Sequence, residues 1–304
     1  MFLVGFIAPP NTVIDDTKIN SMGYTGDVIN TEKPQNSIRI LTLGGSAFFN
    51  RRMADKLKKS LQKKSDKKIE LLGGALRVHS TKSSIIKFKY LSKYKFDYVL
   101  IYHGINDLDA NHIIKNDFKS DYSHINPWYK RNLLLDNSII CRIIYNKFIY
   151  KNTKLKYMAS PYISEPIFKE NLITLINSIK ESGAKPILMT FAYSIPSNYS
   201  FNNFKLNKVG YNNSEKYDRC PVEMWGNPKY VDTAIRHNNN IIHSIKEKYN
   251  VMFIDQHDLM GKDLHWYGDL CHFSKEGTDK FIQNIVDYFN ENKLIKNLNS
   301  ASKN

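Results

Sequence analysis

Short apolar runs alternate with helical segments along most of this chain, and that alternation restricts the possible folds more than any other feature. Five runs have the length and the β-branched or aromatic content of buried strands, and they cover residues 37–46, 68–74, 96–104, 184–193 and 251–256. Strands that alternate with helices build a parallel sheet with helices on both faces. We therefore expect an α/β fold, a flavodoxin-like three-layer sandwich whose five-stranded parallel sheet has the order 2-1-3-4-5.

The segments between these runs carry apolar residues at the spacing of one helix face. After the first run, Met53, Leu57 and Leu61 recur at such intervals. A clear amphipathic helix ends at Gly183, which favours a helix stop. Further helices are predicted around residues 85–91, 230–249 and 275–289.

The length of 304 residues suits one α/β domain with insertions. We assign residues 1–36 to an extended N-terminal lead-in, 37–290 to the domain and 291–304 to a polar C-terminal tail. Two irregular stretches are read as insertions in the domain, the first with a short helix near 139–148, and they cover 108–165 and 194–229.

Composition excludes several classes of protein. The 44 basic and 29 acidic residues give a formal net charge of +15, but the lysines are scattered and accompanied by many asparagines. This pattern indicates compositional bias, and no nucleic-acid partner is expected. The three cysteines, Cys141, Cys220 and Cys271, form no CxxC pair, so neither a zinc ribbon nor a disulfide framework is supported.

The N-terminal sequence MFLVGFIAPP leaves the compartment open. Its eight apolar residues are too few for a membrane span, which needs about 20 residues, and no basic residue precedes them as in a signal peptide. The default expectation is a cytoplasmic protein. If the start of the chain is truncated, the alternative is a cell-envelope protein with membrane association through the missing segment.

Polar residues with catalytic potential follow two of the predicted strands. Ser46 comes directly after the first strand and two glycines, and Asn106 follows the third strand in the segment Gly104–Asp107. A serine at a strand-to-helix turn is exposed as a nucleophile requires, and an asparagine amide can donate to a developing oxyanion. Each signal is weak alone, since serine is a common helix cap and asparagine a common turn residue.

A third signal lies in the loop before the last predicted helix, where Asp269 precedes His272 by three residues. An imidazole that acts as general base needs an acidic partner to fix its tautomer, and this spacing lets both side chains point to one side of a bent loop. The carboxyl ends of parallel strands meet at one edge of a sheet, so we expect Ser46, Asn106 and His272 to lie together.

Together, the Ser46 turn, the GxND segment and the DxxH segment resemble the SGNH (GDSL-like) hydrolase family over residues 37–290. The resemblance implies the fold of that family and a serine esterase that needs no cofactor or metal. It implies the catalytic triad Ser46, Asp269 and His272. The family's usual GDS is here Gly44-Gly45-Ser46, so Gly45 replaces an acidic residue.

The resemblance also implies an oxyanion hole made by the Ser46 N–H, the Asn106 side chain and one backbone N–H after the second strand. The family has a glycine at this last position. Here the donor is either Gly74 or a residue near Arg77, and the sequence leaves both open.

Three other functions remain as alternatives. An O-acyltransferase needs the same residues and the same acyl-enzyme as an esterase that acts on a small-molecule or glycan ester, such as an O-acetyl group. A non-catalytic glycan-binding module is disfavoured because all the reactive residues are present. A metal site is the rival interpretation of the C-terminal cluster, but no helical HxxxH or HExxH pair occurs among His257, Asp258, His265, Asp269 and His272.

Overall fold

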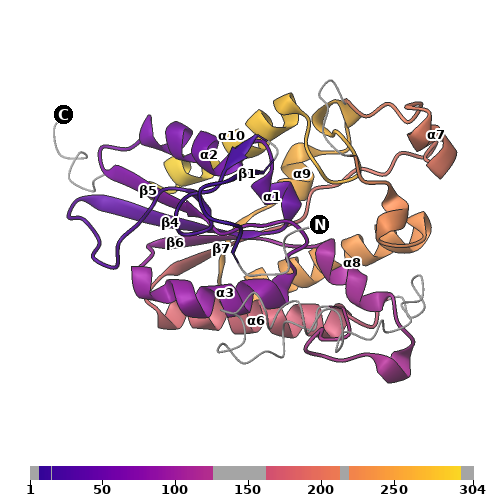
Figure 1. Ribbon diagram of the computed structural model, residues 1–304, viewed down its shortest axis with the longest axis horizontal. Helices are drawn as coiled ribbons and strands as arrows, with labels where there is room; N and C mark the ends of the chain where they lie inside the picture. Colours follow the sequence, from indigo (N-terminus) through magenta and orange to yellow (C-terminus); the bar gives the residue numbers. More distant parts are fainter. Residues whose placement is uncertain (1–6, 15, 126–161, 213–218, 296–304) are drawn as a thin grey trace.

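A six-stranded sheet forms the centre of the computed structural model, which describes residues 7–14, 16–125, 162–212 and 219–295 (Figure 1). In spatial order the strands are β3 (Thr25–Gly26), β5 (Lys68–Gly73), β4 (Ser37–Gly44), β6 (Tyr98–Tyr102), β7 (Lys185–Met189) and β8 (Met252–Ile254). The last five are parallel and have the predicted order 2-1-3-4-5.

The prediction of a purely parallel, five-stranded sheet is wrong at one edge. Strand β3 pairs antiparallel with β5, with Thr25 opposite Gly73. The hydroxyl of Thr25 also donates to the carbonyl of Gly73 over 3.2 Å. A two-residue strand is too short to show any periodicity in sequence, and for the same reason the small hairpin of β1 (Val13–Ile14) and β2 (Thr17–Lys18) in the lead-in was not predicted.

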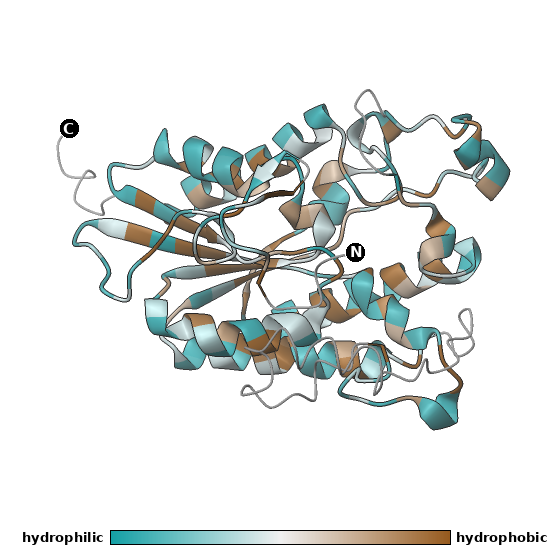
Figure 2. Ribbon diagram, in the orientation of Figure 1, coloured by the Kyte–Doolittle hydropathy of each residue, from teal (hydrophilic) through white to brown (hydrophobic). Residues whose placement is uncertain are grey.

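The sheet divides the hydrophobic core into two clusters because successive side chains of a strand point to opposite faces. All eight residues of β4 are buried; Ile38 and Ile40 join one cluster, and Leu41 and Leu43 join the other. The apolar strand residues appear as brown bands inside a teal periphery in Figure 2.

Helices cover both faces of the sheet, as the alternation predicted (Figure 1). The first cluster includes residues of α1 (Ser46–Phe49), α2 (Met53–Gln62) and α10 (Lys275–Glu291). The second includes residues of α3 (Thr81–Leu91), α6 (Glu165–Glu181) and the C-terminal half of α8 (Pro228–Tyr249). The short helices α7 (Phe201–Lys205) and α9 (Gln256–Met260) lie near the carboxyl ends of the strands.

The helix predicted after the first strand and the second predicted insertion both differ from expectation in the structure. The helix after the first strand is broken into α1 and α2, because Arg51 and Arg52 between them have left-handed backbone conformations with φ of 57° and 55°. The second insertion, predicted as irregular, contains α7 and a 3-10 turn at Val222–Met224. The short helix predicted near 139–148 lies outside the described residues.

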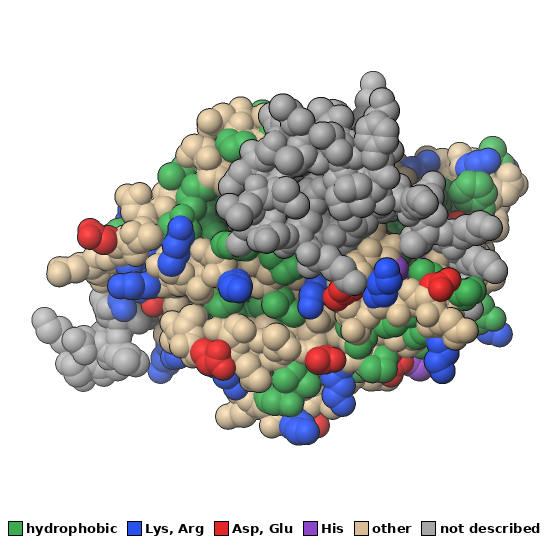
Figure 3. All heavy atoms as spheres, turned by 60° about the horizontal axis from the view of Figure 1, so that its bottom comes forward, with side chains coloured by type: hydrophobic (Ala, Val, Ile, Leu, Met, Phe, Trp, Pro, Cys, Tyr) green, Lys and Arg blue, Asp and Glu red, His purple; other side chains and the backbone are tan. Residues whose placement is uncertain are grey.

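The positive charge is dispersed on the face of the molecule that Figure 3 shows. On the face seen in Figure 3, Lys and Arg side chains are dispersed among acidic, polar and apolar ones and form no single basic patch outside the grey atoms. Within the described ranges, no helix has the length and apolar character needed to cross a membrane.

Candidate active site

Ser46 is the first residue of α1 and follows β4 and Gly45 at the carboxyl edge of the sheet. Its hydroxyl oxygen lies 2.8 Å from Nε2 of His272. The other ring nitrogen of His272, Nδ1, lies 2.8 Å from Oδ2 of Asp269. The three side chains that the sequence singled out therefore form one continuous hydrogen-bonded chain, although Ser46 and His272 are 226 residues apart in sequence.

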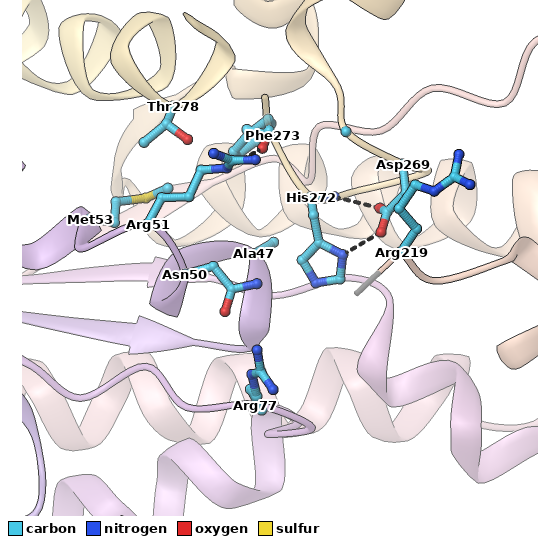
Figure 4. A pocket seen from close by; sticks show the side chains of 11 residues that line it. Ala47, Asn50, Arg51, Met53, Arg77, Arg219, Asp269, His272, Phe273 and Thr278 are labelled. Atoms are coloured by element: carbon cyan, nitrogen blue, oxygen red, sulfur yellow. Dashed lines mark hydrogen bonds and ion pairs between the residues drawn. The ribbon is translucent and has the colours of Figure 1, made fainter. Parts of the chain in front are cut away.

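Backbone amides fix the orientation of Asp269, which is 1% exposed. Its Oδ1 accepts from the N–H groups of Cys271 and His272, and its Oδ2 accepts from the N–H of Cys220, each over 2.9 Å. Figure 4 shows the carboxylate bonded to both the backbone and the ring of His272. With Nδ1–H donating to Asp269, Nε2 is left to accept the proton of Ser46.

The pKa values of this pair shift in the directions expected of an ion pair. Burial alone raises the pKa of Asp269, but the charge of His272 and the hydrogen bonds from His272 and Cys220 together bring it below its usual value. Burial lowers the pKa of His272, but the charge of Asp269 and its hydrogen bond to the ring outweigh that effect and hold the pKa well above 6.5.

Asn106 begins a 3-10 helix, Asn106–Asn111, after the three residues that follow β6. Its Nδ2 donates to the backbone carbonyl of His79 over 3.0 Å. The same nitrogen lies 2.2 Å from the point where a Cβ on Gly45 would be, so the side chain packs against the backbone just before Ser46. Because an amide nitrogen carries two hydrogens, one remains to serve a substrate.

The structure separates the two candidates for the third oxyanion donor. Gly74 ends β5; its carbonyl accepts from Lys87, and a Cβ there would approach the carbonyl of Thr42 to 2.8 Å. Gly74 is absent from the described residues that line the cavity of Ser46, whereas Arg77 and Val78 line it. The geometry thus favours the Arg77 segment over Gly74.

Val78 has a left-handed backbone with φ of 62° and a side chain that is 66% exposed. A β-branched residue in this conformation costs about 1–3 kcal/mol, and such strain concentrates at functional sites. The left-handed conformation of Val78 reverses the loop between β5 and α3 at the cavity that it shares with Ser46.

A fully buried lysine, Lys87, fixes the position of that loop. Lys87 lies on α3, and its Nζ donates to the carbonyl of Gly74 and lies 2.9 Å from Nδ1 of His79. Burial lowers the pKa of this amine well below its usual value. One amine therefore fastens both ends of loop 74–79, and the carbonyl of His79 in turn holds Asn106.

Two hollows meet at the triad. The first is a cavity of about 200 Å³, lined by Ser46, Asn50, Arg77, Val78, Asn106, Asp109, Cys220, Met224, Trp225 and His272. The second is narrower and is drawn in Figure 4, with the side chains of Arg51, Arg77 and Arg219 around His272. Nε of Arg51 donates to the carbonyl of Phe273 over 2.8 Å and so joins the segment after α1 to the loop of His272.

The C-terminal metal cluster considered from the sequence does not come together as a set. Among the described residues, the ligand atoms close enough to share an ion belong to Cys220, Asp269 and His272, within 4.8 Å of one another. His257 instead stacks on Tyr193 at 5.2 Å between ring centroids. Because the side chains of Asp269 and His272 already bond each other, a metal would have to displace the proton between them.

Several residues around the site left no signal in the sequence. Arg51, Lys87, Asp109 and the N–H of Cys220 reach the site only through the fold. A positive φ at Val78 has no sequence signature either, because glycine or asparagine normally marks that conformation.

No protein-family model and no curated protein sequence matches the chain. Solved structures that resemble it include a lipase/acylhydrolase from Enterococcus faecalis, with 17% identity, a TM-score of 0.48, and coverage of 84% of this chain and 96% of that one. A GDSL-like lipase from Bacteroides thetaiotaomicron has 12% identity, a TM-score of 0.49, and coverage of 84% and 88%. A catalytic mutant of an acetylxylan esterase from Geobacillus stearothermophilus has 13% identity, a TM-score of 0.48, and coverage of 83% and 93%.

Proposed function

We propose that this chain is a serine esterase of the SGNH (GDSL-like) type, which hydrolyses an O-acyl ester. The observation that carries the proposal is the relay from Asp269 through His272 to Ser46, with 2.8 Å at each step. A serine hydroxyl is a weak nucleophile unless an oriented base takes its proton, and this relay supplies such a base.

In the proposed reaction, Ser46 Oγ attacks the ester carbonyl while Nε2 of His272 takes its proton. Asp269 stabilises the imidazolium. When the tetrahedral intermediate collapses, the imidazolium returns the proton to the departing alcohol and an acyl-serine remains. Water, deprotonated by His272, then attacks this ester; when the second intermediate collapses, the imidazolium returns the proton to Oγ of Ser46 and the acid is released.

The developing oxyanion is stabilised by three donors in this proposal: the N–H of Ser46, the free N–H of the Asn106 amide and a backbone N–H of the Arg77–Val78 segment. Asn106 and Val78 line the same cavity as Ser46, which supports this assignment over Gly74. The loss of one such donor typically slows turnover by about 100- to 1,000-fold.

An O-acyl group on a glycan, such as O-acetyl, is the substrate we favour, and transfer to an acceptor hydroxyl is the second candidate. Both reactions pass through the same acyl-enzyme, so they differ only in what attacks it. A non-catalytic binding module is disfavoured, since binding alone would not require the aligned relay of Ser46, His272 and Asp269.

The test compares the natural chain with Ser46→Ala on short 4-nitrophenyl esters and acylated sugars, with and without acceptor glycans. Ester turnover and labelling by a fluorophosphonate should disappear in Ser46→Ala and persist in Ser182→Ala, in which an exposed serine is changed. Acylated acceptor among the products would establish the transferase. Turnover that survives Ser46→Ala but not a chelator would contradict the proposal and favour a metal site.

A further inference from the structure

The cavity beside Ser46 contains a carboxyl group that has no part in the triad. Asp109 belongs to the 3-10 helix that begins at Asn106, three residues earlier. Side chains three residues apart in a 3-10 helix eclipse each other, so Asp109 and Asn106 lie on the same side of that helix. Both line the cavity of about 200 Å³ that also contains Ser46.

Asp109 differs from its neighbour Asp107, which points into the protein. Asp107 accepts hydrogen bonds from the N–H and the hydroxyl of Thr81, and it is 0% exposed. The carboxyl of Asp109 has no hydrogen-bond partner within the described part of the chain. Burial, and to a smaller extent the charge of Asp107, raise the pKa of Asp109 to about 7.

Asp109 is half-buried and lines the cavity, so a ligand hydroxyl that reaches it would gain a charge-assisted hydrogen bond. The ligand would also meet apolar walls, since Val78, Met224 and Trp225 line the same cavity. Trp225 is held in place by its backbone carbonyl, which lies 3.0 Å from Nε2 of His112. Apolar walls beside a hydrogen-bond acceptor suit a sugar ring, which has apolar faces and hydroxyl edges.

We propose that Asp109 accepts a hydrogen bond from a free hydroxyl of the substrate and thereby selects O-acyl sugars over simple alkyl or aryl esters. The inference rests on the proposed esterase function and assigns the substrate class at that same site. A long alkyl chain is disfavoured in this cavity because it would bury the carboxyl without a partner. A cationic ligand is disfavoured because Arg77 lines the same cavity and the chain carries a net charge of +15.

The test measures kcat/KM on two substrates: a mono-O-acetylated methyl glucoside, which has free hydroxyls, and 4-nitrophenyl acetate, which has none. Asp109→Leu removes both oxygen acceptors and keeps the branched shape of the side chain. It should lower kcat/KM for the sugar ester by about 10- to 100-fold, the effect of losing a hydrogen bond to a charged group, and leave that for 4-nitrophenyl acetate within about threefold. Asp109→Asn, which keeps one oxygen acceptor, should retain more of the sugar activity than Asp109→Leu.

Asp66→Leu is the matched control, because it makes the same exchange at an exposed aspartate before β5, away from the cavity. It should alter kcat/KM for both substrates by less than about threefold, as expected for a surface substitution. Equal losses on the two substrates in Asp109→Leu and Asp109→Asn, or no loss on either, would overturn the assignment of Asp109. A natural chain that hydrolyses 4-nitrophenyl acetate but no acetylated sugar would overturn it too, while leaving the esterase intact. A natural chain that is inert to both esters and to a fluorophosphonate would refute the proposed function, and the inference with it.

Discussion

Replacement of Gly45 by alanine is the most direct test of the proposed oxyanion hole. The new Cβ would lie 2.2 Å from Nδ2 of Asn106, whereas ordinary contact begins near 3.4 Å. The asparagine amide must therefore move by about 1 Å, and a displacement of that size can lower the rate about 100-fold. The backbone itself tolerates alanine, since Gly45 has φ of −95°.

We expect Gly45→Ala to lower kcat on 4-nitrophenyl acetate by about 100-fold or more while destabilising the fold by only about 1–3 kcal/mol, as overpacking does. Gly268→Ala is the matched control. It adds a methyl group to the loop of His272, but the nearest atoms to its Cβ are 3.6 Å away, so kcat should change little.

The double variant Gly45→Ala/Asn106→Ala separates this mechanism from general damage. If the methyl group acts only by displacing Asn106, the double variant should be no slower than Asn106→Ala alone, because effects through one group are not additive. A folded Gly45→Ala protein with kcat within about threefold of the natural chain would refute the reasoning. Losses that multiply in the double variant would refute it as well.

Three further outcomes are expected for the relay and its support. Asp269→Asn should lower kcat by about 10,000-fold, and His272→Ala should lower it further, because a fraction of correctly oriented imidazole remains in Asp269→Asn. Steady-state kinetics on 4-nitrophenyl acetate compare the two variants. The general base works only when neutral, and the pKa of His272 lies above 6.5, so kcat should fall as the pH drops through a value above 6.5. This acidic limb of the pH profile of kcat should move to lower pH in Asp269→Asn. A midpoint at or below pH 6.5 in the natural protein would contradict the ion pair of Asp269 and His272. Lys87→Met removes the amine that holds loop 74–79, so kcat should fall by about 10- to 100-fold with KM nearly unchanged. Leu91→Ala, which destabilises the same helix, is the control and should leave kcat intact. Equal losses of kcat in the two variants would argue against a positioning role for Lys87.

The parallel core of the fold could be predicted because its signals are local. Each of the five parallel strands is an apolar run, and the long helices have apolar faces, so the alternation itself indicates a parallel sheet with helices on both faces. The antiparallel strand at Thr25–Gly26 could not be predicted, because it depends on pairing with a distant strand and not on its own two residues.

The meeting of Ser46, Asn106, Asp269 and His272 was predictable for a similar reason, since each lies beyond a strand or before a helix, where a parallel sheet collects them. The conformation of loop 74–79 was not, because it depends on a strained valine and a buried lysine. Val78 has a conformation that its residue type disfavours, and Lys87 would be expected at the surface. Sequence rules fail at both positions because tertiary contacts outweigh local preference.

The hydrogen bond between Arg51 and Phe273 joins residues that are 222 positions apart, and this separation has a consequence for the nascent chain. In the proposed reaction, the imidazole that activates Ser46 is synthesised 226 residues after it. At a synthesis rate of about 5–20 residues per second, His272 follows Ser46 by roughly 10–45 s. The proposed esterase therefore requires that His272 be made and docked beside Ser46, and the appearance of ester turnover during refolding should report that docking.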